Sequence, residues 1–332
     1  MPQRSSILKR LHRCRNGAVA HVSSATEPRG KDENEIMKRT PPIAGALAVL
    51  ALIAFSLAAG RAQVATAAPG DLIAEVTTPE GTGLLWARGI SPSVAFDGHY
   101  LYYAEYSGSV LHRIDVPPAG ASTPATGQVD ATITGAPSGI MSIAYDSGRD
   151  LFWAVGGDGL SIYTLGKSGA ATLQFRVDPA SDRPGYQPQM YPAEIKIAYD
   201  RTDDTIWYSP DAFARIYHYQ TSPDALGTAS LVAATPYVDV NMTAECGYSQ
   251  SSGVAVGGSN LLVSISGCPL YFAFTKTGTK VGSYPMQLAS AGDLECDNVS
   301  YGVSVVWVKD EWGGRIQAYE QPSAGACVFG GG

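Results

Sequence analysis

Carboxylate and amide side chains gather at two places in the second half of the sequence. Glu194 precedes one apolar segment, and Glu295, Asp297 and Asn298 stand close together before another. Hard oxygen ligands that converge from several segments are what Ca²⁺ or Mg²⁺ requires. These residues are therefore the candidate ligands of a calcium site, which Lys196 beside Glu194 would weaken.

A second set of side chains is suited to recognition. Its members are aromatic or acidic and stand in polar connections: Glu105, Tyr106, Tyr186, Tyr191, Asp211, Tyr248 and Trp312. Aromatic platforms with polar neighbours suit a protein or glycan ligand. Two of the connections, 182–196 and 237–253, are long and rich in Tyr, Gln, Asn and Pro. They are either recognition loops or simple caps on the fold.

Nucleophilic catalysis has little support. After residue 67 the chain keeps only His99, His112 and His218, and it has no G-x-S-x-G motif. A Ser/His/Asp triad assembles in space and leaves no fixed spacing in the sequence. Exposed or strand-packed histidines are the simpler interpretation.

The elements that position these residues follow from an internal repeat. Five segments begin with an aliphatic residue, a small residue, an aromatic residue or Val, and then Asp or Gly; they start at Val94, Ile143, Ile197, Val254 and Val299. Each continues through a polar turn into a second strand, and a third strand follows. Weaker fourth strands start at Ala171, Ala229 and Lys280. The alternation of apolar and polar residues is the period of a β-strand.

Such units bury both faces only when they stack around an axis, which predicts an all-β fold. We expect a β-propeller of about five four-stranded blades, with six possible if a long connection hides strands. The segment from Asp71 is a spare strand, and the last unit ends soon after its third strand. The amino-terminal strand is therefore expected to complete the last blade and close the ring.

The order Ile-Ala-Tyr-Asp, Leu-Phe-Trp and Ser-Ile-Tyr-Thr after Ile143 resembles the NHL, YWTD and gluconolactonase/regucalcin propeller repeats. The resemblance covers nearly all of residues 90–320. It implies the fold but little about function, because such repeats occur in enzymes, receptors and scaffolds. Regucalcin-like lactonases hold a metal at the channel mouth with carboxylates and Asn. Ser93 and Ser142 stand at comparable positions here and depart from that pattern.

A four-stranded blade has strands A to D from the axis outward. Connections into strand A and B–C turns share one face, where a propeller usually carries its pocket. The candidate ligand and metal residues are all expected there.

Asp97, Asp146 and Asp200 fall in A–B turns, where Asp caps the reversal. Trp153, Trp207 and Trp307 recur at one repeat position, which is typical of packing between blades.

Four cysteines follow residue 67: Cys246, Cys268, Cys296 and Cys327. An even number in an exported protein indicates two disulfides, with three pairings available. The expected blade layout puts Cys246 and Cys268 on one face, which favours the pairs 246–268 and 296–327. No C-x-x-C motif or Cys/His cluster is present, so a zinc site is not expected.

The first 67 residues read as a leader. Residues 1–36 are polar and basic and read as a mis-annotated extension, with Met37 as the true start. Met37-Lys38-Arg39, an apolar run over 43–59 and Ala65-Thr66-Ala67 then form a secretory signal peptide with cleavage near Ala67. A retained membrane anchor is the alternative, although the run is short for a span. One propeller domain, 68–332, is expected to follow.

Removal of the leader leaves an acidic chain. Residues 1–67 hold 10 of the 23 Lys and Arg and 4 of the 30 Asp and Glu, so the remainder has 13 basic and 26 acidic residues, a net charge of −13. That balance argues against nucleic acid and anionic membranes. The sequence thus favours a secreted, monomeric binding propeller for a protein or glycan. The alternative is a calcium-dependent lactonase or other hydrolase with its site at the channel mouth.

Overall fold

The computed structural model describes residues 68–79, 93–177, 195–210, 213–225, 227–321 and 327. The chain divides into two units, 1–62 and 63–332, and all described residues belong to the second. The leader therefore lies outside the described residues.

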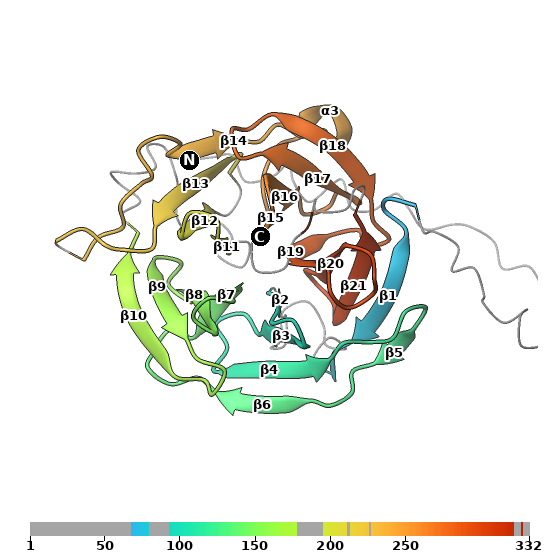
Figure 1. The fold of residues 1–332 in the computed structure, drawn as a ribbon, viewed down its shortest axis with the longest axis horizontal. Helices are drawn as coiled ribbons and strands as arrows, with labels where there is room; N and C mark the ends of the chain where they lie inside the picture. The colour runs from blue at the N-terminus through green and yellow to red at the C-terminus, as the bar shows by residue number, and fades with distance from the viewer. Residues whose placement is uncertain are drawn as a thin grey trace, which may run out of the picture. The chain divides into compact units, whose positions relative to one another are not determined.

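Five sheets surround one axis (Figure 1), which confirms the five-bladed propeller. Blade 1 has β2 (Ala95–Phe96), β3 (Tyr100–Ala104), β4 (Val110–Asp115) and β6 (Val129–Thr132). Blade 2 has β7 (Ile140–Asp146), β8 (Leu151–Gly156), β9 (Ser161–Leu165) and β10 (Ala171–Arg176). Blade 3 has β11 (Lys196–Asp200), β12 (Thr205–Ser209), β13 (Arg215–Gln220) and β14 (Tyr237–Asp239).

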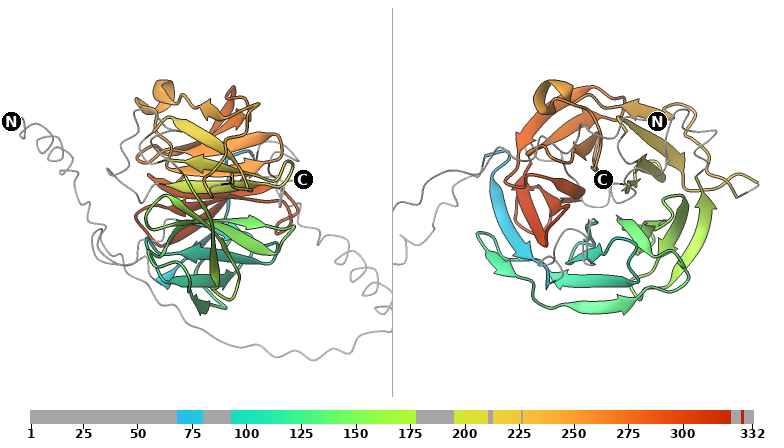
Figure 2. Two further views of the ribbon diagram at one scale, coloured as in Figure 1. Left: turned by 90° about the vertical axis from the view of Figure 1, so that its left-hand side faces the viewer. Right: turned by 180° about the vertical axis from the view of Figure 1, so that it is seen from behind.

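Blade 4 has β15 (Gly253–Gly257), β16 (Asn260–Ser264), β17 (Leu270–Thr275) and β18 (Lys280–Pro285). Blade 5 has β19 (Ala291–Asp297), β20 (Val305–Asp310) and β21 (Arg315–Glu320). A short helix, α3 (Thr243–Cys246), precedes blade 4. One strand of each blade lines the axis: β2, β7, β11, β15 and β19. The view from behind shows the same closed ring of blades (Figure 2).

The amino-terminal strand β1 (Leu72–Thr77) closes the ring as expected, because it pairs antiparallel with β21 and so becomes strand D of blade 5. A further strand, β5 (Ser122–Pro124), was not expected; it leaves blade 1 and pairs parallel with β1. The disulfide Cys296–Cys327 forms in the same blade, with 5.1 Å between its Cα atoms. The last blade is thus held by both ends of the domain.

Hydrophobic residues fill the spaces between blades. Five apolar clusters are present, and each combines side chains from two neighbouring blades. The two-residue period explains this arrangement: Trp207 packs toward blade 4, whereas the next residue, Tyr208, packs toward blade 2. Trp153, Trp207 and Trp307 all point toward the following blade, which confirms them as packing residues.

Two strand assignments made from the sequence are wrong. Strand A of blade 5 is β19, and Val299 lies in the turn after it rather than at its start. Strand D of blade 3 is β14, a three-residue strand at Tyr237–Asp239, whereas the expected strand from Ala229 forms only the isolated bridge of Leu231 with Tyr219. The connection expected over residues 237–253 therefore begins only after β14, at residue 240.

Candidate functional site

Connections into strand A and B–C turns lie together on one face of the ring, here called the B–C face. In blade 2 the Gly157 N–H donates to the Gly139 carbonyl at 2.9 Å, which joins the B–C turn to the connection before β7. In blade 5 the Glu311 N–H donates to the Ser290 carbonyl at 3.2 Å in the same way. The face expected from the sequence is confirmed in these blades.

Four predicted ligand residues lie on this face. Glu105 and Tyr106 are in the B–C turn of blade 1, Tyr248 is in the connection before β15, and Trp312 is in the B–C turn of blade 5. The three aromatic side chains are 39%, 38% and 39% exposed. Other predicted residues fall outside the described residues: Tyr186, Tyr191, Glu194 and Asp211. Ligand binding by either group stays a prediction.

Tyr248 is fixed to its own blade. Its hydroxyl donates to the Ser266 carbonyl in the B–C turn of blade 4. The disulfide Cys246–Cys268 joins the same two segments, with 5.7 Å between Cα atoms, and confirms the second expected pair. An exposed ring held by a hydrogen bond and a nearby disulfide loses little conformational entropy when a ligand packs on it.

Glu311 lies next to Trp312 and is 1% exposed. Its Oε2 accepts hydrogen bonds from the Ser266 and Ser290 hydroxyls, both at 2.5 Å. A Cβ added to Gly292 would lie 2.8 Å from the Glu311 Cα, so the glycine allows this close approach. The carboxylate therefore occupies a specific cradle made by blades 4 and 5. The sequence places Glu311 in this turn but does not show that it is buried.

Three of the predicted metal ligands are among the described residues, and they lie elsewhere in blade 5 than expected. Glu295 and Asp297 belong to strand β19, and Asn298 is exposed in the A–B turn after it. Asp297 caps that turn, because its Oδ1 accepts the N–H groups of Val299 and Ser300 at 2.8 and 3.0 Å. Their expected position before strand A is wrong. Within the described ranges, no three His, Cys, Asp or Glu side chains converge closely enough for a metal ion.

Glu295 lines the central channel. The channel is narrow there: a cavity of about 10 Å³, close to the space for one water molecule, lies between β7, β11, β15 and β19. Burial raises the pKa of Glu295 to about 8, although N–H groups of Cys296, Phe96 and Tyr145 bond to its carboxylate. Two residues earlier on the same strand, burial also raises the pKa of Asp293, against the attraction of Lys196.

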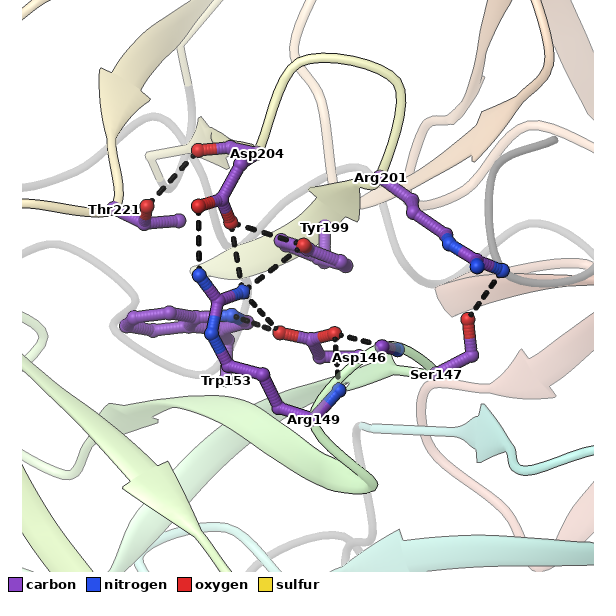
Figure 3. Close-up of polar contacts among 9 residues, drawn as sticks. Asp146, Ser147, Arg149, Trp153, Tyr199, Arg201, Asp204 and Thr221 are labelled. Carbon is purple, nitrogen blue, oxygen red and sulfur yellow. Dashed lines mark hydrogen bonds and ion pairs between the residues drawn. The ribbon is translucent and has the colours of Figure 1, made fainter.

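The opposite face, here called the A–B face, holds the repeated aspartates. Asp146 accepts the Gly148 and Arg149 N–H groups at 2.9 and 3.1 Å and the Trp153 indole N–H at 3.3 Å. The Arg149 guanidinium joins Asp146 at 2.6 Å and reaches Asp204 of blade 3 at 2.7 Å (Figure 3). These contacts confirm the structural role expected for the turn aspartates.

Cations link other blades on the A–B face in the same way. Lys167 of blade 2 pairs with Asp97 of blade 1 at 2.8 Å, and Lys276 of blade 4 pairs with Asp200 of blade 3 at 2.5 Å. Burial would raise the pKa of Asp200, but Lys276 and the other donors hold it below its ordinary value. The A–B face is thus a set of satisfied charge pairs between blades.

One arrangement superficially resembles a triad. The Thr205 hydroxyl lies 2.6 Å from His218 Nε2 and 2.5 Å from Asp203 Oδ1, and the His218 ring stacks on Trp207 at 3.8 Å. The other ring nitrogen faces the Thr235 carbonyl rather than a carboxylate. Thr205 is only 2% exposed, and burial lowers the pKa of His218. The geometry fits packing inside blade 3.

A separate hollow of about 530 Å³ lies on the outer side of blades 3 and 4. Residues of β14, α3 and the turn between β17 and β18 line it, including Asp239, Asn241 and Lys280. Its charged groups are already paired, since Asp239 bonds Arg215 and Lys280 bonds Glu245. The sequence did not single out this hollow.

The chain was compared with known proteins. No family model and no curated protein matches the chain. A solved glutaminyl cyclase from Myxococcus xanthus is similar over 75% of this chain and 97% of its own, at 10% identity and a TM-score of 0.45. A virginiamycin B lyase from Staphylococcus aureus matches over 67% of this chain and 62% of its own, at 15% identity and a TM-score of 0.35.

A nidogen/laminin complex matches over 60% of this chain and 81% of its own, at 12% identity and a TM-score of 0.36. At these identities and TM-scores, the matches carry no conclusion about this chain. In the described ranges, the structure contains no helix with the length and apolar character needed to cross a membrane.

Proposed function

We propose that this chain is a secreted binding protein that presents its B–C face to a protein or glycan ligand. One observation carries the proposal. Among the described residues, the exposed aromatic side chains are Tyr106, Tyr237, Tyr248 and Trp312. Three of them lie on the B–C face, in blades 1, 4 and 5, which are consecutive around the ring.

Large aromatic rings are costly to leave in water and are typical anchors of binding surfaces. Glu105 adds a carboxylate in the turn of Tyr106. The net charge of −13 after the expected cleavage favours a neutral or basic ligand over nucleic acid. The NHL, YWTD or gluconolactonase/regucalcin resemblance agrees with a ligand on this face.

Export is supported by the leader pattern and by the two disulfides, which persist in oxidising compartments. We expect cleavage near Ala67 and a monomeric product. Amino-terminal sequencing and sedimentation of the exported protein test both points.

Trp312 provides the assay. It is the exposed tryptophan of the described residues, since Trp153, Trp207 and Trp307 are at most 3% exposed. The exported protein is applied to arrays of glycans and of peptides, and hits are confirmed by tryptophan fluorescence titration. Trp312→Ala and Tyr248→Ala should each weaken binding about tenfold or more. Isothermal titration calorimetry measures the variants, because Trp312→Ala removes the fluorescent reporter.

Tyr237→Ala is the matched control. Tyr237 is 41% exposed but lies on outer strand β14, away from the B–C face. Equal loss in the control, or no loss in either test variant, would contradict the proposal. A rise in Tm with CaCl₂ that Glu295→Gln removes would favour the calcium-dependent hydrolase instead.

A further inference from the structure

One oxygen of the cradled Glu311 carboxylate lacks a partner. Oε2 takes both serine hydroxyls, whereas Oε1 is buried and accepts no hydrogen bond in the described part of the chain. A buried acceptor left without a donor costs about 1–3 kcal/mol, and more when it is charged. Most buried polar groups in proteins are satisfied, and among the described carboxylates Glu320 Oε2 is the other buried oxygen without a partner.

The described cations around this turn do not supply the missing donor. Nearby cations are engaged elsewhere: the Lys309 ammonium donates to the Asp310 and Gly313 carbonyls, and Arg315 pairs with Asp310 at 3.1 Å. The missing donor therefore has to come from outside the described residues.

We infer that Glu311 is the anionic anchor for a primary ammonium group, the end of a lysine side chain on a protein bound at the B–C face. This inference rests on the proposed function and narrows its ligand. Trp312 follows Glu311 in the chain, and the Tyr248 hydroxyl bonds Ser266, which cradles the carboxylate. An ammonium entering here meets a carboxylate and nearby exposed aromatic rings, which favour cations.

The buried position of Oε1 favours a narrow donor. An alkyl chain with a terminal ammonium is narrower than a guanidinium or an amino-sugar ring. It also carries three donors and a full charge, which can satisfy Oε1 and neutralise the buried carboxylate. The acidic balance of the expected mature chain would attract basic partners.

The test uses the exported full-length protein and blocked pentapeptides that differ at one position, lysine or norleucine. We expect the lysine peptide to bind about tenfold tighter or more, the effect of one charge-assisted hydrogen bond. Glu311→Gln should reduce that preference below about twofold, because it removes the charge at nearly constant shape. Asp224→Asn, which changes an exposed carboxylate between β13 and β14, is the matched control and should keep the preference.

A second measurement on the wild-type protein tests the anchor even if Glu311→Gln does not fold. In the wild-type protein, n-butylammonium chloride should shift the ¹³C resonance of the Glu311 carboxyl, and 1-butanol should not. Equal binding of both peptides, a preference that survives Glu311→Gln, or no shift with n-butylammonium would overturn the anchor. A water on Oε1 that n-butylammonium does not displace would also overturn it.

The remaining outcomes separate the two proposals. If a glucosamine trimer binds more tightly than the lysine peptide, the lysine assignment is wrong. If array ligands bind through Trp312 with no preference for an ammonium, the proposed function stands and the anchor fails. If no ligand depends on Trp312 or Tyr248, both the proposed function and the Glu311 anchor fail.

Discussion

Replacement of Glu295 by Gln should change how stability depends on pH. The folded protein holds the pKa of Glu295 at about 8, because burial beside the narrow channel penalises the charged form. In the unfolded chain the pKa returns to its ordinary value of 4.5. Between these two values the folded state binds more protons than the unfolded state, so stability falls as pH rises.

The magnitude follows from these two pKa values. One proton bound over this interval gives a slope approaching 1.4 kcal/mol per pH unit, and integration from pH 5 to pH 7 gives a loss of about 2.5 kcal/mol. Glu295→Gln cannot titrate and should not lose this amount. Asp293, whose pKa is also raised by burial, contributes in the same direction in both proteins.

Urea unfolding at pH 5, 6, 7 and 8 measures the difference. The wild type should lose about 2.5 kcal/mol more than Glu295→Gln between pH 5 and pH 7. Glu105→Gln serves as the control carboxylate and should follow the wild-type profile. Parallel profiles for the wild type and Glu295→Gln would show that the Glu295 carboxylate is solvated and would refute the reasoning.

Three further changes probe how the ring is held. Lys276→Met should destabilise the protein by about 2–4 kcal/mol at pH 7, because it leaves the buried Asp200 carboxylate without its ion pair. Thermal scans at low pH should show a smaller loss, because Asp200 is then protonated. Replacement of Cys296 and Cys327 by Ala removes the disulfide between residues separated by 31 positions. Urea unfolding should show a free energy of unfolding lower by about 3–4 kcal/mol. Val76→Asp puts a charge into the core between blades 5 and 1, so calorimetry should show loss of cooperative unfolding.

The sequence predicts the propeller because its period is repeated in every blade. The error in blade 5 shows the limit of that pattern. The Trp indole N–H bonds the turn Asp over a separation of seven residues at Asp146–Trp153 and Asp200–Trp207, but over ten at Asp297–Trp307. A longer A–B turn shifted the apparent start of the repeat. Alignment on the Asp and Trp pair would have placed Asp297 in the turn.

The candidate site was predictable only in its location. Exposed rings at Tyr106, Tyr248 and Trp312 follow from their place in turns on one face. The burial of Glu311 does not, because it depends on Ser266 and on residues before β19 that meet only when blades 4 and 5 pack together. Contacts between neighbouring units leave no period in a single sequence, so this cradle required the structure.

Three buried aspartates of the A–B turns are paired with cations, whereas the Glu311 carboxylate is held by serine hydroxyls alone among the described side chains. On the A–B face, Asp97, Asp146 and Asp200 each have a cation within 2.8 Å, so their cost of burial is already compensated. On the B–C face, Glu311 retains an oxygen without a donor among the described residues. Glu320, at the end of β21, also has a buried oxygen without a donor among the described residues. Glu311 differs because it lies on the face that carries the exposed rings, where a bound ligand could supply the donor.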